Sequence, residues 1–154
     1  MFRKGNLMTP ITAVPVTAEA GLHAQVSDFY SRQMRLLDDG EAQAWAATFA
    51  ENGTFIASGH QAPTTGRPDL AAAVRAGQAE LAAAGIVHRH WLGMITVDQC
   101  GDGTVRARCY ALVIATQRGG DSVIHRSTTC DDVLLRDGDG FVVESRSVTR
   151  DDLR

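Results

Sequence analysis

The back half of the chain contains four long segments in which apolar and polar residues tend to alternate. They cover residues 86–98, 104–117, 122–136 and 141–149. A period of two is typical of β-strands, whose successive side chains point to opposite faces of a sheet. The connecting sequences, CGDGT, RGGD and DGDG, are short and rich in Gly and Asp, as tight hairpin turns require. The back half therefore predicts a four-stranded antiparallel meander.

The front half has the pattern of helices. Residues 18–37 and 41–50 place apolar side chains at helical spacing, and a third helix runs from Pro68 to the residue before Gly85. Proline suits the first turn of a helix, and glycine suits its C-terminal stop. A short strand, TFIAS, separates the second helix from the third. Helices followed by an antiparallel sheet predict an α+β fold with the helices on one face of the sheet.

The predicted strands exceed the common length of about five or six residues. Long strands in one sheet must twist and curve, so a sheet folded over three helices encloses a cone-shaped cavity. We therefore expect residues 18–154 to form a single domain, a cone-shaped α+β barrel with a curved, mainly antiparallel sheet. Residues 1–17 contain two prolines and no sustained apolar run, and they predict a flexible N-terminal arm.

Charge and composition exclude several classes of protein. The net charge of the 154 residues is −3 and no stretch concentrates Lys or Arg, which argues against binding to nucleic acid. No apolar stretch reaches the length that crosses a membrane. The three cysteines form no C-x-x-C motif, and buried free thiols in a reducing compartment are the simplest interpretation. We expect a cytoplasmic protein.

A pair of histidines opens the first long strand, in the sequence HRHWL. Alternation puts His88 and His90 on one face and Arg89 and Trp91 on the other. A metal site would need a third and usually a fourth ligand, and the next acid in the sequence is Asp98. We therefore predict no metal and no other cofactor. His88 is expected to be solvent-facing or hydrogen-bonded, whereas His90 is a candidate for proton transfer inside the cavity.

Other side chains are candidates for the same chemistry. Tyr30 is either a core residue or a phenol that stabilises an oxyanion, and Tyr110 presents the same alternatives. His125 is a second candidate acid or base, in a strand whose two faces both mix polar and apolar residues, as in a wet pocket or a subunit interface. His60 lies in a loop that could border the cavity mouth.

Two further interpretations concern packing and ligand contact. Asp131-Asp132 and Arg146 are expected to form a structural ion pair between neighbouring strands. The two tryptophans, Trp45 and Trp91, are most simply core residues. The set predicted to contact a ligand comprises Tyr110, Trp91, His60, Phe55 and Met34.

Several segments, taken in order, resemble one family. They are FYSRQMRLLDDGEAQAWAATFAENGTF, the pair Gly66-Arg67, HRHWLGMITVD with GDGTVRARCYALV, and DDVLLRDGDGFVVESRSVTRDDL with Arg146. The chain resembles the nuclear transport factor 2-like superfamily and its SnoaL-like branch from about residue 20 to the C-terminus. The resemblance implies a cone fold that serves isomerases, dehydratases, cyclases and non-catalytic subunits alike. It also implies a histidine at position 90 and favours a role in aromatic polyketide tailoring.

The leading hypothesis is a cofactor-independent enzyme of the lyase or isomerase class that acts on a small hydrophobic cyclic or polyketide-like ligand. His90, with His125 in reserve, would remove a proton next to a carbonyl, and Tyr30 or Tyr110 would stabilise the enolate. Cyclisation, dehydration or isomerisation would follow. The alternative is a non-catalytic binding or assembly subunit, comparable to the small subunits of ring-hydroxylating dioxygenases. In either case we expect a homodimer formed through the outer face of the sheet.

Overall fold

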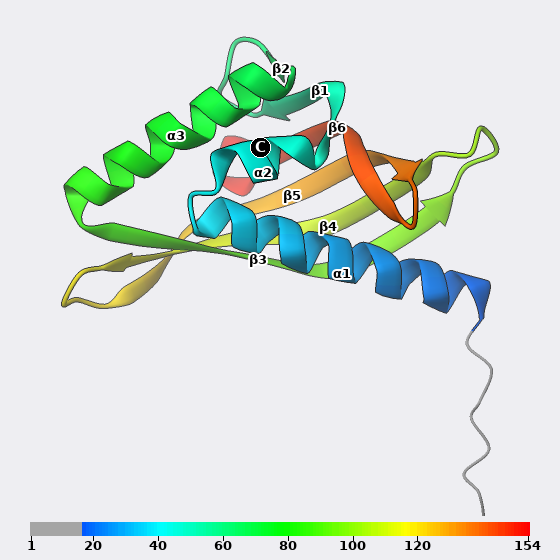
Figure 1. Cartoon of the computed structure of the whole chain (residues 1–154). Helices are drawn as coiled ribbons and strands as arrows, with labels where there is room; N and C mark the ends of the chain where they lie inside the picture. The colour runs from blue at the N-terminus through cyan, green and yellow to red at the C-terminus, as the bar shows by residue number, and fades with distance from the viewer. Residues whose placement is uncertain (1–16) are drawn as a thin grey trace, which may run out of the picture.

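The computed structural model describes residues 17–154 and has three helices packed on one face of a curved, six-stranded sheet (Figure 1). The front half forms α1 (Ala18–Asp38), α2 (Ala42–Ala47), β1 (Phe49–Ala57), β2 (Thr64–Thr65) and α3 (Arg67–Ala84). The back half forms β3 (Ile86–Gln99), β4 (Val105–Gln117), β5 (Ser122–Asp137), β6 (Gly140–Arg150) and the 3-10 turn η1 (Asp151–Leu153). The predicted α+β architecture is confirmed.

The strand order is β2-β1-β6-β5-β4-β3. The meander from β3 to β6 is antiparallel, as predicted, whereas β1 runs parallel to β6 at the other side of the sheet. Two predicted boundaries were wrong. The second helix ends at Ala47, and the chain enters β1 already at Phe49. In addition, the two-residue strand β2 was not predicted. Phe49 is buried in the strand as it would be in a helix, so its apolar character could not decide between them.

Helix ends follow the expected local chemistry. The Thr17 hydroxyl accepts a hydrogen bond from the backbone N–H of Ala20 at 3.2 Å and begins α1. Pro68 lies in the first turn of α3, and Gly85 ends that helix in the left-handed conformation with φ of 68°. The predicted N-terminal arm, residues 1–17, lies outside the described residues apart from Thr17. Within residues 17–154, no helix is both long and apolar enough to cross a membrane.

The core lies between the helices and the concave face of the sheet. Tyr30, Trp45 and Phe49 pack there against sheet residues such as Val105 and Leu134, and the ring centroids of Trp45 and Phe49 are 4.8 Å apart. The cysteines are free thiols; Cys109 and Cys130 are buried and face each other across β4 and β5, and Cys100 is half-buried.

One alternative that the sequence left open is decided by β4. Its small face, with Val105, Ala107 and Cys109, is buried under the helices, which turns Arg108 and Tyr110 to the convex face. Small side chains let the helices approach the sheet closely at this end.

Irregular pairing bends the sheet at several places, and two of them lie in the strands around the histidines. The register of β3 on β4 shifts between Gly93 and Thr96, where Met94 adopts a φ of 53°. The register of β4 on β5 shifts between Val113 and Ile114. An extra residue on one strand increases the local twist and bend. The bent sheet leaves a cavity between its concave face and the helices.

Candidate active site

The cavity has two lobes. The helix lobe, about 260 Å³, lies between α3 and the start of β3 and is lined mainly by apolar side chains. The sheet lobe, about 330 Å³, extends over β4, β5 and β6 and carries more polar groups. Small-molecule sites commonly occupy roughly 300–1,000 Å³. Four residues border both lobes, so we treat them as one cavity: Leu37, Trp45, Phe55 and His90.

His90 lies at the border of the two lobes and is held by a carboxylate from α1. Its Nδ1 is 2.6 Å from Oδ1 of Asp38, and the backbone N–H of His90 donates to Oδ2 of the same carboxylate at 3.1 Å. The side chains of Asp38 and His90 are 9% and 23% exposed. An ionised carboxylate only accepts hydrogen bonds, so it keeps the ring proton on Nδ1 and leaves the lone pair on Nε2. A base oriented by a third group is the arrangement that proton transfer requires.

The end of α1 explains why Asp38 lies there. Asp38 is the last residue of the helix, and Gly40, with φ of 74°, turns the chain into α2. α1 packs along β3, so its C-terminal turn lies over the backbone of His90. The bidentate contact to the ring and the backbone of one residue fixes the direction of the imidazole.

His88 and His125 form a second group beside His90. The ring centroid of His88 is 5.2 Å from that of His125 and 6.5 Å from that of His90. Burial lowers the pKa of His88, and the positive charges that His125 and His90 can carry lower it further. His88 borders the helix lobe, whereas His125 borders neither lobe and is exposed. Among residues 17–154, no three His, Cys, Asp or Glu side chains are grouped so that they could hold a metal ion.

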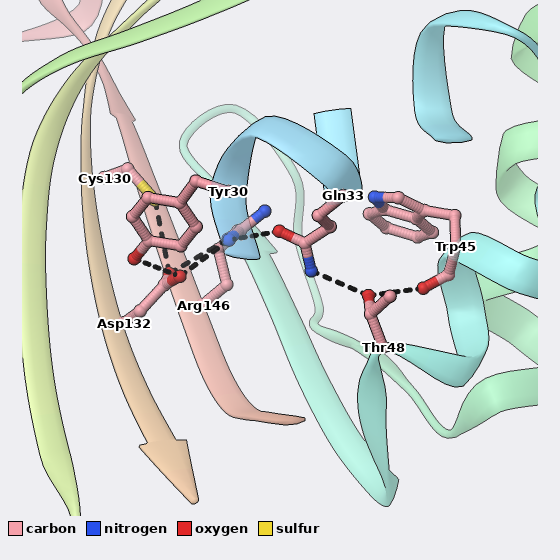
Figure 2. Close-up of polar contacts among 7 residues, drawn as sticks. All are labelled: Tyr30, Gln33, Trp45, Thr48, Cys130, Asp132 and Arg146. Atoms are coloured by element: carbon pink, nitrogen blue, oxygen red, sulfur yellow. Dashed lines mark hydrogen bonds and ion pairs between the residues drawn. The ribbon is translucent and has the colours of Figure 1, made fainter. Parts of the chain in front are cut away.

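A buried network lies under the floor of the sheet lobe (Figure 2). Arg146 on β6 donates from Nε and Nη2 to Asp132 on β5, at 2.9 and 2.6 Å, and from Nη2 to Oε1 of Gln33 at 2.8 Å. Tyr30 donates its hydroxyl to Oδ2 of Asp132 at 2.8 Å. Gln33 in turn donates to Thr48 at 2.7 Å. The network ties α1 to the sheet, and the predicted ion pair forms with Asp132.

The electrostatics of this network follow from its burial. The side chains of Arg146 and Asp132 are 4% and 0% exposed. Burial alone would lower the pKa of Arg146, but the neighbouring Asp132 carboxylate raises it above its usual range. Burial and the same carboxylate raise the pKa of Tyr30, so its hydroxyl stays protonated and donates.

The sequence model of one domain family, described as the SnoaL-like domain, matches residues 18–147. The chain belongs to the SnoaL-like domain family. Its nuclear transport factor 2-like fold was the one expected from the resemblance. A comparison with curated protein sequences found no match.

Solved structures agree with this assignment. Aln2 from a Streptomyces species is 33% identical, with a TM-score of 0.79 over 86% of this chain and 93% of that one. ActVI-ORFA from Streptomyces coelicolor is 32% identical, with a TM-score of 0.78 over 86% of this chain and 98% of that one. A Catenulispora acidiphila protein in complex with S-DNPA is 32% identical, with a TM-score of 0.75 over 87% of this chain and 96% of that one.

Several residues singled out from the sequence line the cavity of this SnoaL-like domain. His90 borders both lobes, and Met34, Phe55 and His60 border the sheet lobe. His60 is exposed, in keeping with a position at the cavity mouth. Their roles towards a ligand remain predictions.

Besides His125, three of the predicted site residues do not border the cavity, and their predicted contact with a ligand was wrong: Tyr30, Tyr110 and Trp91. Tyr30 borders neither lobe, and its hydroxyl is committed to Asp132, so it is a core residue and does not face a substrate. Tyr110 and Trp91 lie on the convex face and are 60% and 65% exposed, because strand alternation points them away from the helices. The expectation that Trp91 is a core residue was also wrong, whereas Trp45 is buried as expected.

Three residues of the candidate site were missed: Asp38, which holds His90, and two arginines that border the cavity. Asp38 was interpreted only as part of the DDG sequence that stops a helix, although an acid in the last turn, where the helix dipole disfavours it, is a signal of some other role. Arg126 and Arg150 border the sheet lobe and carry no recognisable motif. Alternation along β5 and β6 could have placed them on the inner face with Thr128 and Arg146.

Proposed function

We propose that this SnoaL-like protein is a cofactor-independent acid–base enzyme that removes a proton from carbon next to a carbonyl in a cyclic or polyketide-type substrate. The observation that carries the proposal is the His90–Asp38 pair, which stands at the border of both lobes with one ring nitrogen left for a ligand. A base within reach of an apolar pocket is the minimum that such chemistry needs.

The residues of the cavity support a two-step reaction. His90 Nε2 accepts the proton, and the Asp38 carboxylate stabilises the imidazolium that results. The negative charge that develops on the carbonyl oxygen is favoured by the sheet lobe, which is lined by Arg126, Arg146 and Arg150 and by no Asp or Glu. The imidazolium then returns the proton to a leaving hydroxyl or to another carbon. The first outcome is a dehydration and the second an isomerisation, which are lyase and isomerase chemistry.

The substrate class rests on the family and its neighbours. The SnoaL-like resemblance implies polyketide tailoring, and a protein 32% identical to this chain is described in complex with a small ligand, S-DNPA. The mainly apolar helix lobe, with Leu70, Val74 and Leu81 from α3, suits a ring system.

Hydrogen–deuterium exchange tests the proposed proton transfer without knowledge of the natural substrate. α-Tetralone, a bicyclic ketone, is incubated in D₂O, and loss of its α-proton signal is followed by NMR. We expect the wild-type protein to accelerate exchange and His90→Gln to lower the rate by roughly 10²- to 10⁴-fold. If His125→Ala abolishes exchange and His90→Gln does not, the proton-transfer role belongs to the other strand. If the wild-type protein gives only the buffer rate, the enzyme proposal is contradicted for this class of ketone.

A non-catalytic binding or assembly subunit is the second candidate, and one observation favours it. The convex face exposes large apolar side chains, and a groove there of about 650 Å³ is lined in part by Trp91, Met94 and Tyr110. Exposed apolar patches of this kind mark protein interfaces. A subunit would bind its ligand in the exchange assay without accelerating exchange.

We also propose that the convex face pairs two copies of the chain, because a two-fold axis would bury the same apolar groove on both. Light scattering should give about twice the chain mass of 16.5 kDa. The double variant Trp91→Asp/Met94→Asp should give the monomer mass with an unchanged fold. A wild-type mass near 16.5 kDa at micromolar concentration contradicts the dimer. The cytoplasm remains the predicted location, in keeping with the free, buried thiols of Cys109 and Cys130.

A further inference from the structure

Trp45 carries an unusual indole nitrogen. The residue lies on α2, borders both lobes and is only 4% exposed. In the part of the chain that the structure describes, its Nε1 is the one buried side-chain nitrogen or oxygen without a hydrogen-bond partner. Buried donors are nearly always paired, since an unpaired one loses its hydration and gains nothing. An acceptor atom on a bound ligand would supply the missing partner.

Arg146 offers a second donor to the same lobe. Its Nε and Nη2 are bonded to Asp132 and Gln33, and the structure gives no hydrogen bond for Nη1 within residues 17–154. Both Arg146 and Trp45 border the sheet lobe. Figure 2 shows the indole nitrogen at the end of Trp45 that points towards Gln33 and Arg146, and it shows the third nitrogen of Arg146 on the side away from Asp132.

The charge of the sheet lobe indicates what these donors bind. Three arginines and no Asp or Glu border it. Arg146 and Arg150 are paired with Asp132 and Asp152, but Arg126 forms no ion pair within residues 17–154. The lobe therefore has uncompensated positive charge, which favours an anionic oxygen over a neutral one.

We propose that Trp45 Nε1 and Arg146 Nη1 bind a carboxylate of the substrate, so that the natural substrate is a ring-bearing carbonyl compound that also carries a carboxylic acid group. The carboxylate accepts from the indole N–H and from the guanidinium in the sheet lobe, while the remainder of the ligand reaches His90 at the border of the lobes. This inference rests on the proposed function for the reaction that follows, but the binding it describes does not require turnover.

The indole proton can be observed directly. The chain has two tryptophans, so the ¹⁵N-labelled variant Trp91→Phe leaves Trp45 as the single source of an indole N–H signal. Trp91 is 65% exposed, and its replacement leaves the cavity unchanged. Addition of 2-naphthoate should move the Trp45 signal downfield, as hydrogen bonding to a carboxylate does, and 2-methylnaphthalene should not. A signal that stays in place at millimolar 2-naphthoate overturns the proposal.

The variant Trp45→Phe removes the N–H and keeps a ring, with Trp91→Phe as its matched control. We expect 2-naphthoate to bind about 10- to 100-fold more weakly, the loss of one hydrogen bond to a charged acceptor, while the control binds as wild type. Trp45 also packs in the core against Phe49, so the smaller ring should lower the melting temperature without naphthoate only modestly, because removal of an unpaired buried donor offsets part of the lost packing. Weaker binding together with a large fall in melting temperature shows a packing role and overturns the assignment.

A second variant tests the charge. Arg126→Gln should weaken 2-naphthoate and leave 2-naphthamide, its neutral counterpart, unchanged. Equal losses for both probes, or wild-type binding of naphthamide as tight as that of naphthoate, contradict the carboxylate. A protein that binds naphthoate through Trp45 but exchanges no α-proton would refute the proposed reaction and keep this site.

Discussion

Two carboxylates in this protein each hold a nitrogen-bearing side chain, and the two pairs differ in what they leave free. Asp132 is fully buried and accepts hydrogen bonds from Arg146 and Tyr30, and Arg146 is bonded onward to Gln33. Asp38 accepts from the backbone and ring of His90 alone, and the far nitrogen of that ring stays free at the border of the cavity.

The difference distinguishes a carboxylate that stabilises the fold from one that orients a group proposed to transfer a proton. In the Asp132 network the carboxylate is saturated and joins α1, β5 and β6, so Asp132 itself stabilises the fold, and the network's contacts within residues 17–154 leave only Nη1 of Arg146 for a ligand. In the Asp38 pair His90 borders a lobe lined mainly by apolar side chains and keeps one ring nitrogen without a hydrogen bond to residues 17–154, which is why we propose that it acts on a ligand. Burial alone would have ranked Asp132 and Tyr30 above His90. His90 is the better candidate because one of its ring nitrogens has no hydrogen-bond partner in the described part of the chain, whereas the polar atoms of Asp132 and Tyr30 are bonded to each other and to Arg146.

The largest expected effect is on stability. Asp132→Ala leaves the Arg146 charge buried and unpaired, and it should lower the free energy of unfolding by about 3–5 kcal/mol. Asp131→Ala is a matched control one residue away, where the carboxylate is 43% exposed and pairs with Arg106 on the convex face. The control should cost about 1 kcal/mol or less. Urea unfolding measures the stability of both variants. Equal losses in Asp132→Ala and Asp131→Ala would contradict the structural role assigned to the buried Asp132–Arg146 pair.

At the Asp38–His90 pair we expect a smaller loss of stability than at Asp132, together with a loss of exchange rate. Asp38→Ala removes the group that orients His90, so α-proton exchange of α-tetralone should slow by on the order of 10²-fold. The free energy of unfolding should fall by about 1.5–3 kcal/mol, the cost of a hydrogen bond to a charged group. Asp39→Ala is the control, because its side chain is 67% exposed and lies 4.0 Å from Arg89 on the other face. Asp38 acts through His90, so restoring the carboxylate with Asp38→Glu should recover part of the rate. No kinetic loss in Asp38→Ala contradicts the positioning role.

The smallest effect expected concerns pH. The pKa of His88 is lowered below the 6.5 of an unfolded histidine, first by burial. The unfolded chain therefore binds more protons than the folded one just below pH 6.5, and stability is lost as the pH falls from 6.5 through the lowered pKa. Asp38, His90, His125 and Arg126 are the charged groups around it.

The test is the melting temperature between pH 7 and pH 5. His88→Gln should show a shallower fall than wild type, whereas the control His23→Gln, an exposed residue of α1, should follow wild type. A fall that is unchanged in His88→Gln would assign the pH dependence to other groups.

Much of the fold could be predicted because burial imposes a period on the sequence. The alternation of β3 put His88 and His90 on one face and Trp91 on the other, and the structure has this arrangement. Gly85 marked the end of α3 because only a left-handed residue closes the helix there. Two-residue β2 has too few residues to show a period, and it was missed.

The site was less predictable because its contacts join distant parts of the chain. Asp38 and His90 are 52 residues apart, and Tyr30 and Asp132 are 102 residues apart. No local pattern states which partner a side chain will meet. The shift in pairing after Val113 also lets His125 approach His88, although strict alternation groups it with Ser127 and Thr129 of the convex face. Period-based reasoning fails where the period is interrupted.

The tautomer of His90 tests the central claim most directly. In the ¹⁵N-labelled protein at pH 8, two-bond ¹H–¹⁵N correlations of the imidazole, assigned by comparison with His90→Gln, report which nitrogen carries the proton. We expect the proton on Nδ1 and the lone pair on Nε2, because Nδ1 is 2.6 Å from Asp38. Asp38→Ala should lose this preference. A wild-type ring that carries its proton on Nε2, or whose tautomer is unaffected by Asp38→Ala, would contradict the assignment of His90 as the oriented base.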